Sequence, residues 1–230
     1  MITFKLPIYG LLVLVCSMPL LPAQQSSAKE KIRLSFCASH ISGKQRNVYL
    51  ASEKLQKDKK IEWQEIRLNT NVATEPIVHK GARILYFYDK EGEEAKLLAQ
   101  VKLGGISKNY ILLFLPKKSA YHVIAIPNNE FSFGEYHFRN LSKYPVNIEV
   151  GGKKKTLLKH QAASFSANKN GKPDWVVIKA KLKERIRTLR QTNWQLSSQQ
   201  RELIVIYEHP SGNRLSLKHI ISGKTLKRPK

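Results

Sequence analysis

Short apolar segments that alternate with polar residues constrain the fold of this 230-residue chain most strongly. Ile32, Leu34, Phe36 and Ala38 alternate with Arg33, Ser35 and Cys37, which is the period of two expected of a strand with one buried face. Similar segments recur about every 8–12 residues, with turn-forming residues between them. This pattern predicts an all-β protein built from sandwiches or a barrel.

The predicted strands share this alternation. In chain order they cover residues 32–38, 48–50, 61–68, 83–88, 97–103, 110–115, 121–126, 135–141, 146–150, 156–165, 175 onward, 186–196, 203–207 and 215–221. Residues 142–145, between two of these strands, have the composition of a hairpin turn. The sequence shows no internal repeat.

One segment also fits a helix, because Trp175, Ile178, Leu182, Ile186 and Leu189 fall at helical spacing. The β-branched run at 176–178 and the basic residues at every odd position from 179 to 187 favour a strand instead.

The first 23 residues are typical of a secretory signal, with Lys5 ahead of an apolar run that ends near Ala23. Three prolines in this stretch argue against a spanning helix, so we expect cleavage and no membrane span in the mature chain. Cys37 is then the one remaining cysteine, either a buried strand residue or a thiol that pairs with another chain. An exported protein without a disulfide is more typical of the bacterial envelope, so we expect the mature chain to be periplasmic or secreted.

Pro127-Asn128-Asn129 is the best candidate for a domain boundary. We therefore predict a signal peptide at 1–23, a β-sandwich domain at 24–127, a basic β-sandwich domain at 128–223 and a basic tail at 224–230. The whole chain has a formal net charge of +23, and residues 128–230 carry 21 basic against 7 acidic residues. Such a field favours anionic partners.

Two clusters of basic residues are the candidate anion-binding sites. On a single strand, alternate residues share a face, so the first cluster would form one stripe about 26 Å long. Its alternative role is that of a solvated edge strand, where lysines prevent edge-to-edge aggregation. The second cluster also fits a charged hairpin tip. The first comprises Lys179, Lys181, Lys183, Arg185 and Arg187, and the second comprises Lys153, Lys154 and Lys155.

Searches for other chemistry give no candidates. The sequence has no Gly-x-Ser-x-Gly motif, no phosphate-binding glycine loop and no close histidine pair with metal-ligand spacing. We therefore predict no catalytic, cofactor-binding or metal-binding residues. Zinc-finger spacing and RNA-binding signatures are also missing, so nucleic acid is not an expected partner.

Residues 134–148, which read GEYHFRNLSKYPVNI, are the most distinctive run of the chain. This run resembles the start of the second immunoglobulin-like domain of periplasmic pilus chaperones. The resemblance implies two such domains. It also implies an anchor for a partner's carboxylate, made by an arginine near the mature N-terminus and a lysine in the cleft. Arg33 lies suitably early for the arginine, and no lysine of this chain matches the second anchor. The overall pattern also resembles uncharacterised secreted β-rich envelope proteins of Gram-negative bacteria.

The sequence therefore predicts an exported, non-enzymatic binding or structural module with two immunoglobulin-like sandwiches. Its expected partner is an anionic envelope surface, such as lipopolysaccharide or an acidic glycan, or else an envelope protein. The first alternative is a chaperone-like assembly protein that acts by β-strand addition. The second is a hydrolase of cell-wall glycan.

Overall fold

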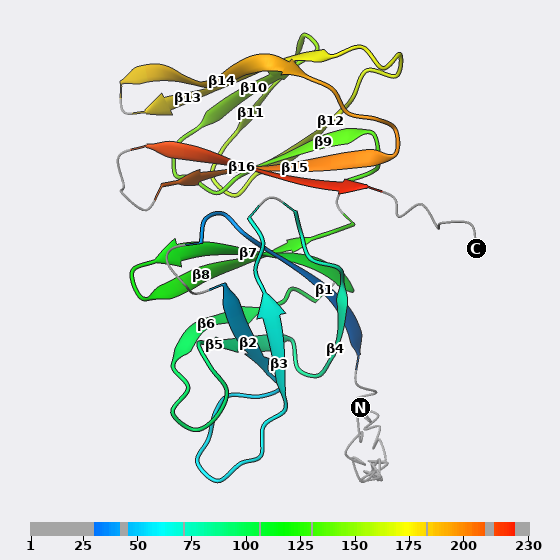
Figure 1. Cartoon of the computed structure of the whole chain (residues 1–230). Helices are drawn as coiled ribbons and strands as arrows, with labels where there is room; N and C mark the ends of the chain where they lie inside the picture. Colours follow the sequence, from blue (N-terminus) through cyan, green and yellow to red (C-terminus); the bar gives the residue numbers. More distant parts are fainter. Residues whose placement is uncertain are drawn as a thin grey trace, which may run out of the picture.

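The computed structural model describes residues 30–41, 46–70, 72–105, 107–129, 131–182, 184–209 and 214–223. The predicted signal peptide and the basic tail lie outside these residues. The regular elements of the described ranges are β-strands, which confirms the all-β prediction (Figure 1). They are β1 (Lys31–Ala38), β2 (Asn47–Ala51), β3 (Trp63–Arg67), β4 (Ile77–Lys80), β5 (Ile84–Tyr88), β6 (Leu97–Lys102), β7 (Asn109–Lys117), β8 (Ala120–Pro127), β9 (Glu135–Asn140), β10 (Val146–Val150), β11 (Lys153–Leu157), β12 (Ala162–Ser166), β13 (Asp174–Leu182), β14 (Arg185–Trp194), β15 (Gln200–Glu208) and β16 (Leu215–Gly223).

Four sheets of four strands are stacked in four layers (Figure 1). Sheet B has the order β3-β2-β5-β6 and packs on sheet A, which has the order β4-β1-β7-β8. Sheet C has the order β12-β9-β15-β16 and packs on sheet D, which has the order β11-β10-β13-β14. The chain therefore forms two β-sandwiches, one from β1–β8 and one from β9–β16.

The two sandwiches repeat one topology. Each strand of the second sandwich occupies the sheet position of the strand eight places earlier in the first, so that 4-1-7-8 becomes 12-9-15-16 and 3-2-5-6 becomes 11-10-13-14. The parallel pair of each sandwich is also equivalent, β1 with β7 and β9 with β15. A sequence search for repeats misses this relation because strand order depends on patterning and turns, and very different residues can supply both.

Each sandwich has its own core. In the first, Phe36, Phe87 and Phe114 are fully buried and their rings meet edge-on or tilted, with centroids 5.0–6.4 Å apart. In the second, Phe138 stacks on Trp194, with ring centroids 6.1 Å apart. Such aromatic pairs add to the burial of their apolar area.

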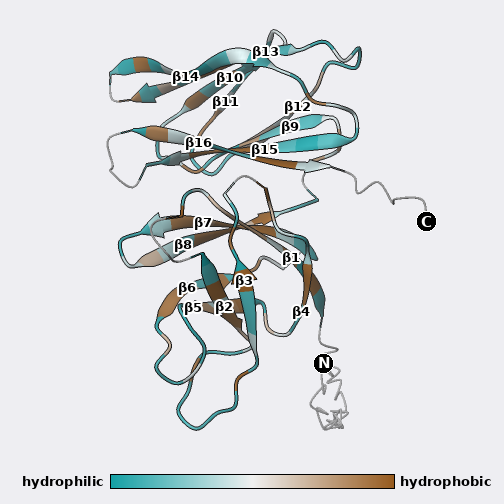
Figure 2. Cartoon of the chain, in the orientation of Figure 1, coloured by the Kyte–Doolittle hydropathy of each residue, from teal (hydrophilic) through white to brown (hydrophobic). Residues whose placement is uncertain are grey.

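A third apolar cluster joins the sandwiches, and it lies between sheets A and C. Ile111 and Leu113 of β7 face Leu203 and Val205 of β15, and all four are buried. Since β7 and β15 are also buried on their other faces, each is apolar along most of its length. The hydrophobic colour along β7 in Figure 2 shows this pattern.

Arg201 stabilises the segment that connects the two sandwiches. Its Nη1 donates to the carbonyl oxygens of Asn128 and Phe131, at 2.9 and 3.2 Å. Its guanidinium also lies 5.0 Å from the ring centroid of Phe131 and 4.9 Å from that of Phe133. Burial lowers the pKa of Arg201, but the group keeps its charge because an arginine pKa lies far above neutral pH.

Three details of the predicted strands are wrong. The strand predicted at 156–165 is two strands, β11 and β12, with a turn at His160, whose φ is 64°. The strand β4 was not predicted. Residues 142–145 are no hairpin, because β9 belongs to sheet C and β10 to sheet D.

Asn140 explains why the chain changes sheets after β9. Its buried Nδ2 donates to the carbonyl oxygens of Tyr144 and Leu157, at 2.7 and 3.0 Å. Its Oδ1 accepts from the backbone N–H and the hydroxyl of Ser142, at 2.9 and 2.8 Å. The side chain thus takes the place of the ladder hydrogen bonds that a hairpin would supply.

Candidate anion-binding surface

The outer face of sheet D carries the best candidate site. Val176, Ile178 and Ala180 of β13 point into the sandwich and are fully buried. The alternate residues of the same strand must therefore point outward, away from sheet C. These are Trp175, Val177, Lys179 and Lys181.

The pairing register extends this face over all four strands, because residues opposite one another in a ladder share a face. Asn147 pairs with Lys179 and with Thr156, and Glu149 pairs with Val177 and with Lys154. On the other side of β13, four residues of the edge strand complete the face. They are Asn193, Gln191, Thr188 and Ile186, which pair with Trp175, Val177, Lys179 and Lys181. The term "outer face of sheet D" means these twelve residues of β10, β11, β13 and β14.

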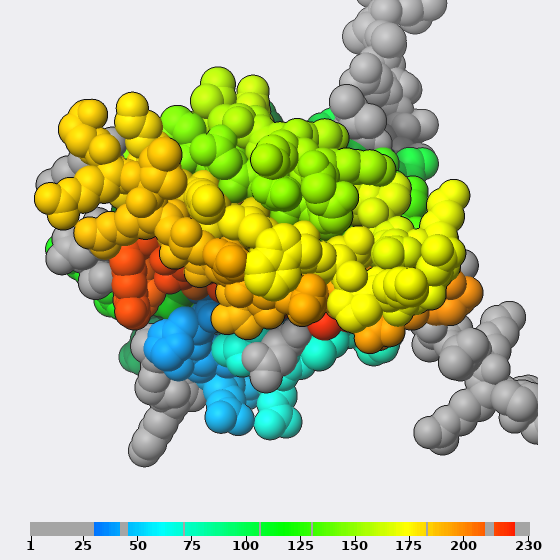
Figure 3. Space-filling view, turned by 90° about the horizontal axis from the view of Figure 1, so that it is seen from above, coloured from blue at the N-terminus to red at the C-terminus, as the bar shows by residue number. Residues whose placement is uncertain are grey.

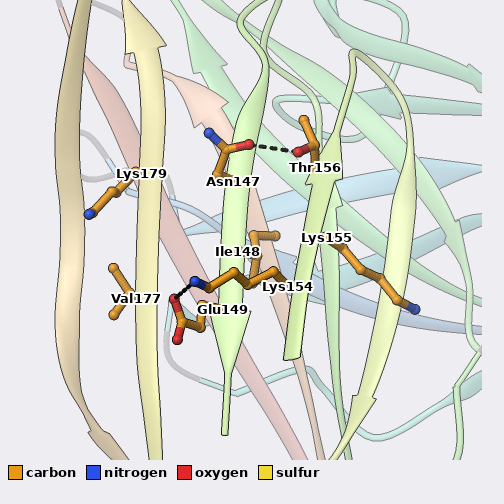
Figure 4. Close-up of a pocket in the computed structure, with 8 residues that line it drawn as sticks. All are labelled: Asn147, Ile148, Glu149, Lys154, Lys155, Thr156, Val177 and Lys179. Carbon is orange, nitrogen blue, oxygen red and sulfur yellow. Dashed lines mark hydrogen bonds and ion pairs between the residues drawn. The ribbon is translucent and has the colours of Figure 1, made fainter. Parts of the chain in front are cut away.

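Figure 3 looks onto this face, which is formed by the green-yellow and gold residues of β10, β11, β13 and β14. It holds a groove of about 380 Å³ that crosses β11, β10 and β13 (Figure 4). The groove is lined by Asn147, Ile148, Glu149, Lys154, Lys155, Thr156, Val177 and Lys179. The structure therefore places Lys154 of one predicted cluster on the same face as Lys179 of the other, whereas the Lys155 side chain points away from Lys179 (Figure 4).

Lysine charge exceeds carboxylate charge on this face. Lys154 Nζ lies 3.6 Å from Glu149 Oε2, an exposed ion pair that contributes little to stability. Glu149 is the one carboxylate among the twelve residues of the outer face, whereas Lys154, Lys179 and Lys181 are three exposed ammonium groups. The face is therefore net positive.

Uncharged polar groups fill the space between the lysines. The Thr156 hydroxyl donates to Asn147 Oδ1 at 2.7 Å, which fixes the orientation of the Asn147 amide (Figure 4). Gln191 and Thr188 are exposed on the neighbouring strand. Trp175 is 44% exposed at one end of the β13 row, and Ile186 is 67% exposed near the other.

The prediction that five basic residues lie on one strand is wrong. The chain turns after Leu182, so Lys179 and Lys181 lie on β13 while Arg185 and Arg187 lie on β14. Arg185 and Arg187 pair with Leu182 and Ala180, so their side chains start on the opposite face of the sheet. Lys183 lies outside the described residues.

The cluster at 153–155 also divides between two faces. Lys154 points to the outer face, whereas Lys155 pairs with buried Ile148 and reaches across the open edge of the sandwich. There, Lys155 Nζ donates to the Ser164 carbonyl at 3.3 Å and lies 5.3 Å from the Phe165 ring centroid. Lys153 pairs with buried Val150 and starts on the same face as Lys155.

Sequence reasoning missed Trp175 as part of the site. The signal was present, because Trp175 is an even number of residues from Lys179 and Lys181 and must share their face if the segment is a strand. Asn147 and Thr156 could not be found in this way, since their place depends on the pairing of β10 with β13 and β11.

Cysteine, histidine and carboxylate side chains of the described residues give no second candidate site. Cys37 is fully buried in the cluster between sheets A and C, where burial raises the pKa of its thiol to about 11 and the nearby Lys218 ammonium opposes the rise. In the described ranges, no three His, Cys, Asp or Glu side chains are grouped so that they could hold a metal ion. No helix able to cross a membrane is found among these residues either.

Comparison with known protein families and with characterised proteins finds no match to this chain. The site therefore has to be interpreted from its own residues.

Proposed function

We propose that this chain is an exported, non-enzymatic binding module of the bacterial envelope, and that the outer face of sheet D binds an anionic partner. The observation that carries the proposal is the position of Lys179 and Lys181. Lysines on an edge strand prevent aggregation, but β13 is an interior strand that pairs with β10 and β14 on its two sides. Edge protection therefore does not account for the lysines of β13, and an anion would offset their mutual repulsion.

Arg185 and Arg187 fit the protective role instead. They lie on β14, a ten-residue edge strand whose side chains are mostly exposed. Figure 2 shows the hydrophilic colour of much of this strand. We assign these two residues to protection of the edge and not to ligand binding.

The chemistry of the face supports binding and not catalysis. Acid–base catalysis of glycan hydrolysis uses two carboxyl groups on opposite sides of the reacting bond. The twelve residues of the outer face supply one carboxylate, and it is paired with Lys154. Export to the envelope is supported by the apolar run behind Lys5, and the basic second half of the chain suits an anionic surface.

The proposal is tested by binding to anionic and neutral vesicles and polysaccharides over a range of salt concentrations. The double variant Lys179→Gln/Lys181→Gln is compared with Lys57→Gln/Lys60→Gln, which removes the same charge from an exposed loop of the first sandwich. We expect affinity for anionic ligands to fall steeply with salt, and about tenfold in the first variant alone. Equal losses in both variants would show attraction to net charge and would contradict a site on sheet D.

Strand addition is the second candidate, and the exposed edge of β14 is the observation that favours it. An added strand would bond to the backbone of this edge, so its affinity would change little with salt. The arginines of β14 and the irregular register between Ile178 and Lys179 oppose such pairing. A protein partner that stays bound at high salt, and that is lost when Thr188→Pro is introduced, would favour this candidate over anion binding.

A further inference from the structure

We propose that the ligand of the outer face of sheet D is a linear acidic polysaccharide that lies along β13, with one sugar ring packed on Trp175. This inference rests on the proposed function, since it names the class of anion that the same face binds.

The shape of the face suits an extended chain. Trp175 and Lys181 stand at the two ends of the outward row of β13, about 20 Å apart at the rise of a strand. The groove lies beside this row, where Val177 and Lys179 line it together with residues of β10 and β11 (Figure 4). A ligand that contacts Trp175, Lys179 and Lys181 together must therefore be a polymer of several units.

Trp175 offers an apolar contact in addition to the charges of the lysines. The other tryptophan of sheet D, Trp194, packs in the core against Phe138, whereas Trp175 is 44% exposed on a polar face. An exposed indole on a polar face is unusual, because burial of the ring releases a large apolar area from water. One face of a pyranose ring presents C–H groups and can cover the indole, while its hydroxyl groups stay in contact with water.

The polar groups beside the lysines match a ligand rich in hydroxyl groups. The amides of Asn147, Gln191 and Asn193 and the hydroxyl of Thr188 can both donate and accept hydrogen bonds, whereas Thr156, whose proton goes to Asn147, can accept one. Hydroxyl groups of a sugar need such partners when water is displaced. A phospholipid headgroup offers few hydroxyl groups, and its phosphate and ester oxygens accept hydrogen bonds but do not donate them.

The positive charge of the lysines on this face indicates that the polymer is acidic. Lys179 and Lys181 are two residues apart on one face, about 7 Å along the strand. Lys154 adds a third ammonium group beside the groove, and Glu149 is paired with it at 3.6 Å. Acidic groups that repeat along a polysaccharide can meet these ammonium groups in turn. A neutral polymer would leave them uncompensated.

Single-stranded nucleic acid fits the face less well. Proteins that bind it stack successive bases on several aromatic side chains. Trp175 is the one aromatic residue among the twelve of the outer face, and this face carries lysines and no arginines. Arginine is the residue favoured for paired hydrogen bonds to phosphate.

The test measures affinity for polygalacturonate at about 0.15 M salt, where long-range attraction is screened. Neutral dextran, phosphatidylglycerol vesicles and a single-stranded DNA oligomer are measured beside it. We expect Trp175→Ala to weaken polygalacturonate binding about tenfold and Trp175→Tyr to retain most of it. Val72→Ala is the matched control, because it removes an exposed apolar side chain of the first sandwich, away from the outer face of sheet D, and should leave affinity unchanged.

The outcomes separate this inference from the proposed function. If Lys179→Gln/Lys181→Gln weakens binding but Trp175→Ala does not, the face binds anions in general and the polysaccharide inference is wrong. Tight binding to the vesicles or the DNA, without binding to polygalacturonate, overturns the inference in the same way. If none of the anionic ligands binds, both proposals fail. Circular dichroism of each variant confirms that it is folded.

Discussion

His137 shows how a single residue ties the stability of the second sandwich to pH. Its ring stacks on Phe131 with centroids 4.7 Å apart, and its Nδ1 lies 2.9 Å from Ser164 Oγ. The pKa of His137 is lowered to about 4, chiefly by burial and also by the Arg139 cation, while Glu135 opposes the shift. The folded state thus holds this imidazole neutral at pH values where the unfolded chain binds a proton.

The pH dependence follows from that difference. Between the unfolded pKa near 6.5 and the folded pKa near 4, the unfolded chain binds more protons, so the free energy of unfolding falls as pH falls. We expect His137→Gln to flatten this part of the stability profile, measured by urea unfolding at pH 7, 6, 5 and 4. The exposed His40→Gln is the control. The same slope in wild type and His137→Gln would contradict this assignment.

Cys37 leads to a second prediction at the residue scale. Its side chain has no exposed surface, and its pKa of about 11 keeps the thiol protonated at neutral pH. Since the thiolate is the reactive form, we expect Cys37 to resist iodoacetamide in the native protein and to react once guanidinium unfolds the chain. Mass spectrometry of the Cys37 peptide measures both states. Rapid labelling of the native protein would instead support a thiol available to pair with another chain.

At the scale of elements, the passage from β9 to β10 depends on Asn140. Aspartate at this position would keep the acceptor for Ser142 but lose both hydrogen bonds to carbonyl oxygens. It would also bury a charge, so we expect Asn140→Asp to lower the free energy of unfolding by about 2–4 kcal/mol. Urea unfolding measures the change, with exposed Asn109→Asp as control. A loss no larger than that of the control would show that the crossing is held by other contacts.

The elements also show what could be predicted from the sequence. Alternation located most strands, because a half-buried strand must repeat every two residues, as β13 does. It missed the break at His160, since no glycine or proline marks that turn. The same alternation placed the basic residues of 179–187 on one strand. The two strands of a hairpin each alternate with a period of two, so the period alone does not reveal the turn between them. Which strands pair is decided by long-range packing, which local sequence does not contain.

At the scale of the molecule, the equivalent sheets of two sandwiches with the same topology face one another. Leu203 lies at this interface, fully buried with Ile111 and Leu113 opposite it. We expect Leu203→Ala to cost about 2–5 kcal/mol, because it leaves a cavity between tightly packed sheets. Thermal unfolding measures the loss, with exposed Ile186→Ala as control. A cost below about 1 kcal/mol would show that the interface adds little to stability.

The stacking of the sheets also determines which surface is free for a ligand. Sheet A is covered on both faces, and sheet C is covered by sheets A and D (Figure 1). The broad sheet faces left to solvent are the outer faces of sheets B and D. Of these two, the outer face of sheet D belongs to the more basic half of the chain.

Lysine footprinting locates the binding site on the surface of the protein. The protein is acetylated with and without polygalacturonate, and the modified peptides are quantified by mass spectrometry. We expect the polymer to protect Lys154, Lys179 and Lys181 from acetylation and to leave Lys57 and Lys60 as reactive as in its absence. Equal protection of all five lysines, or protection confined to the first sandwich, would contradict a binding site on sheet D.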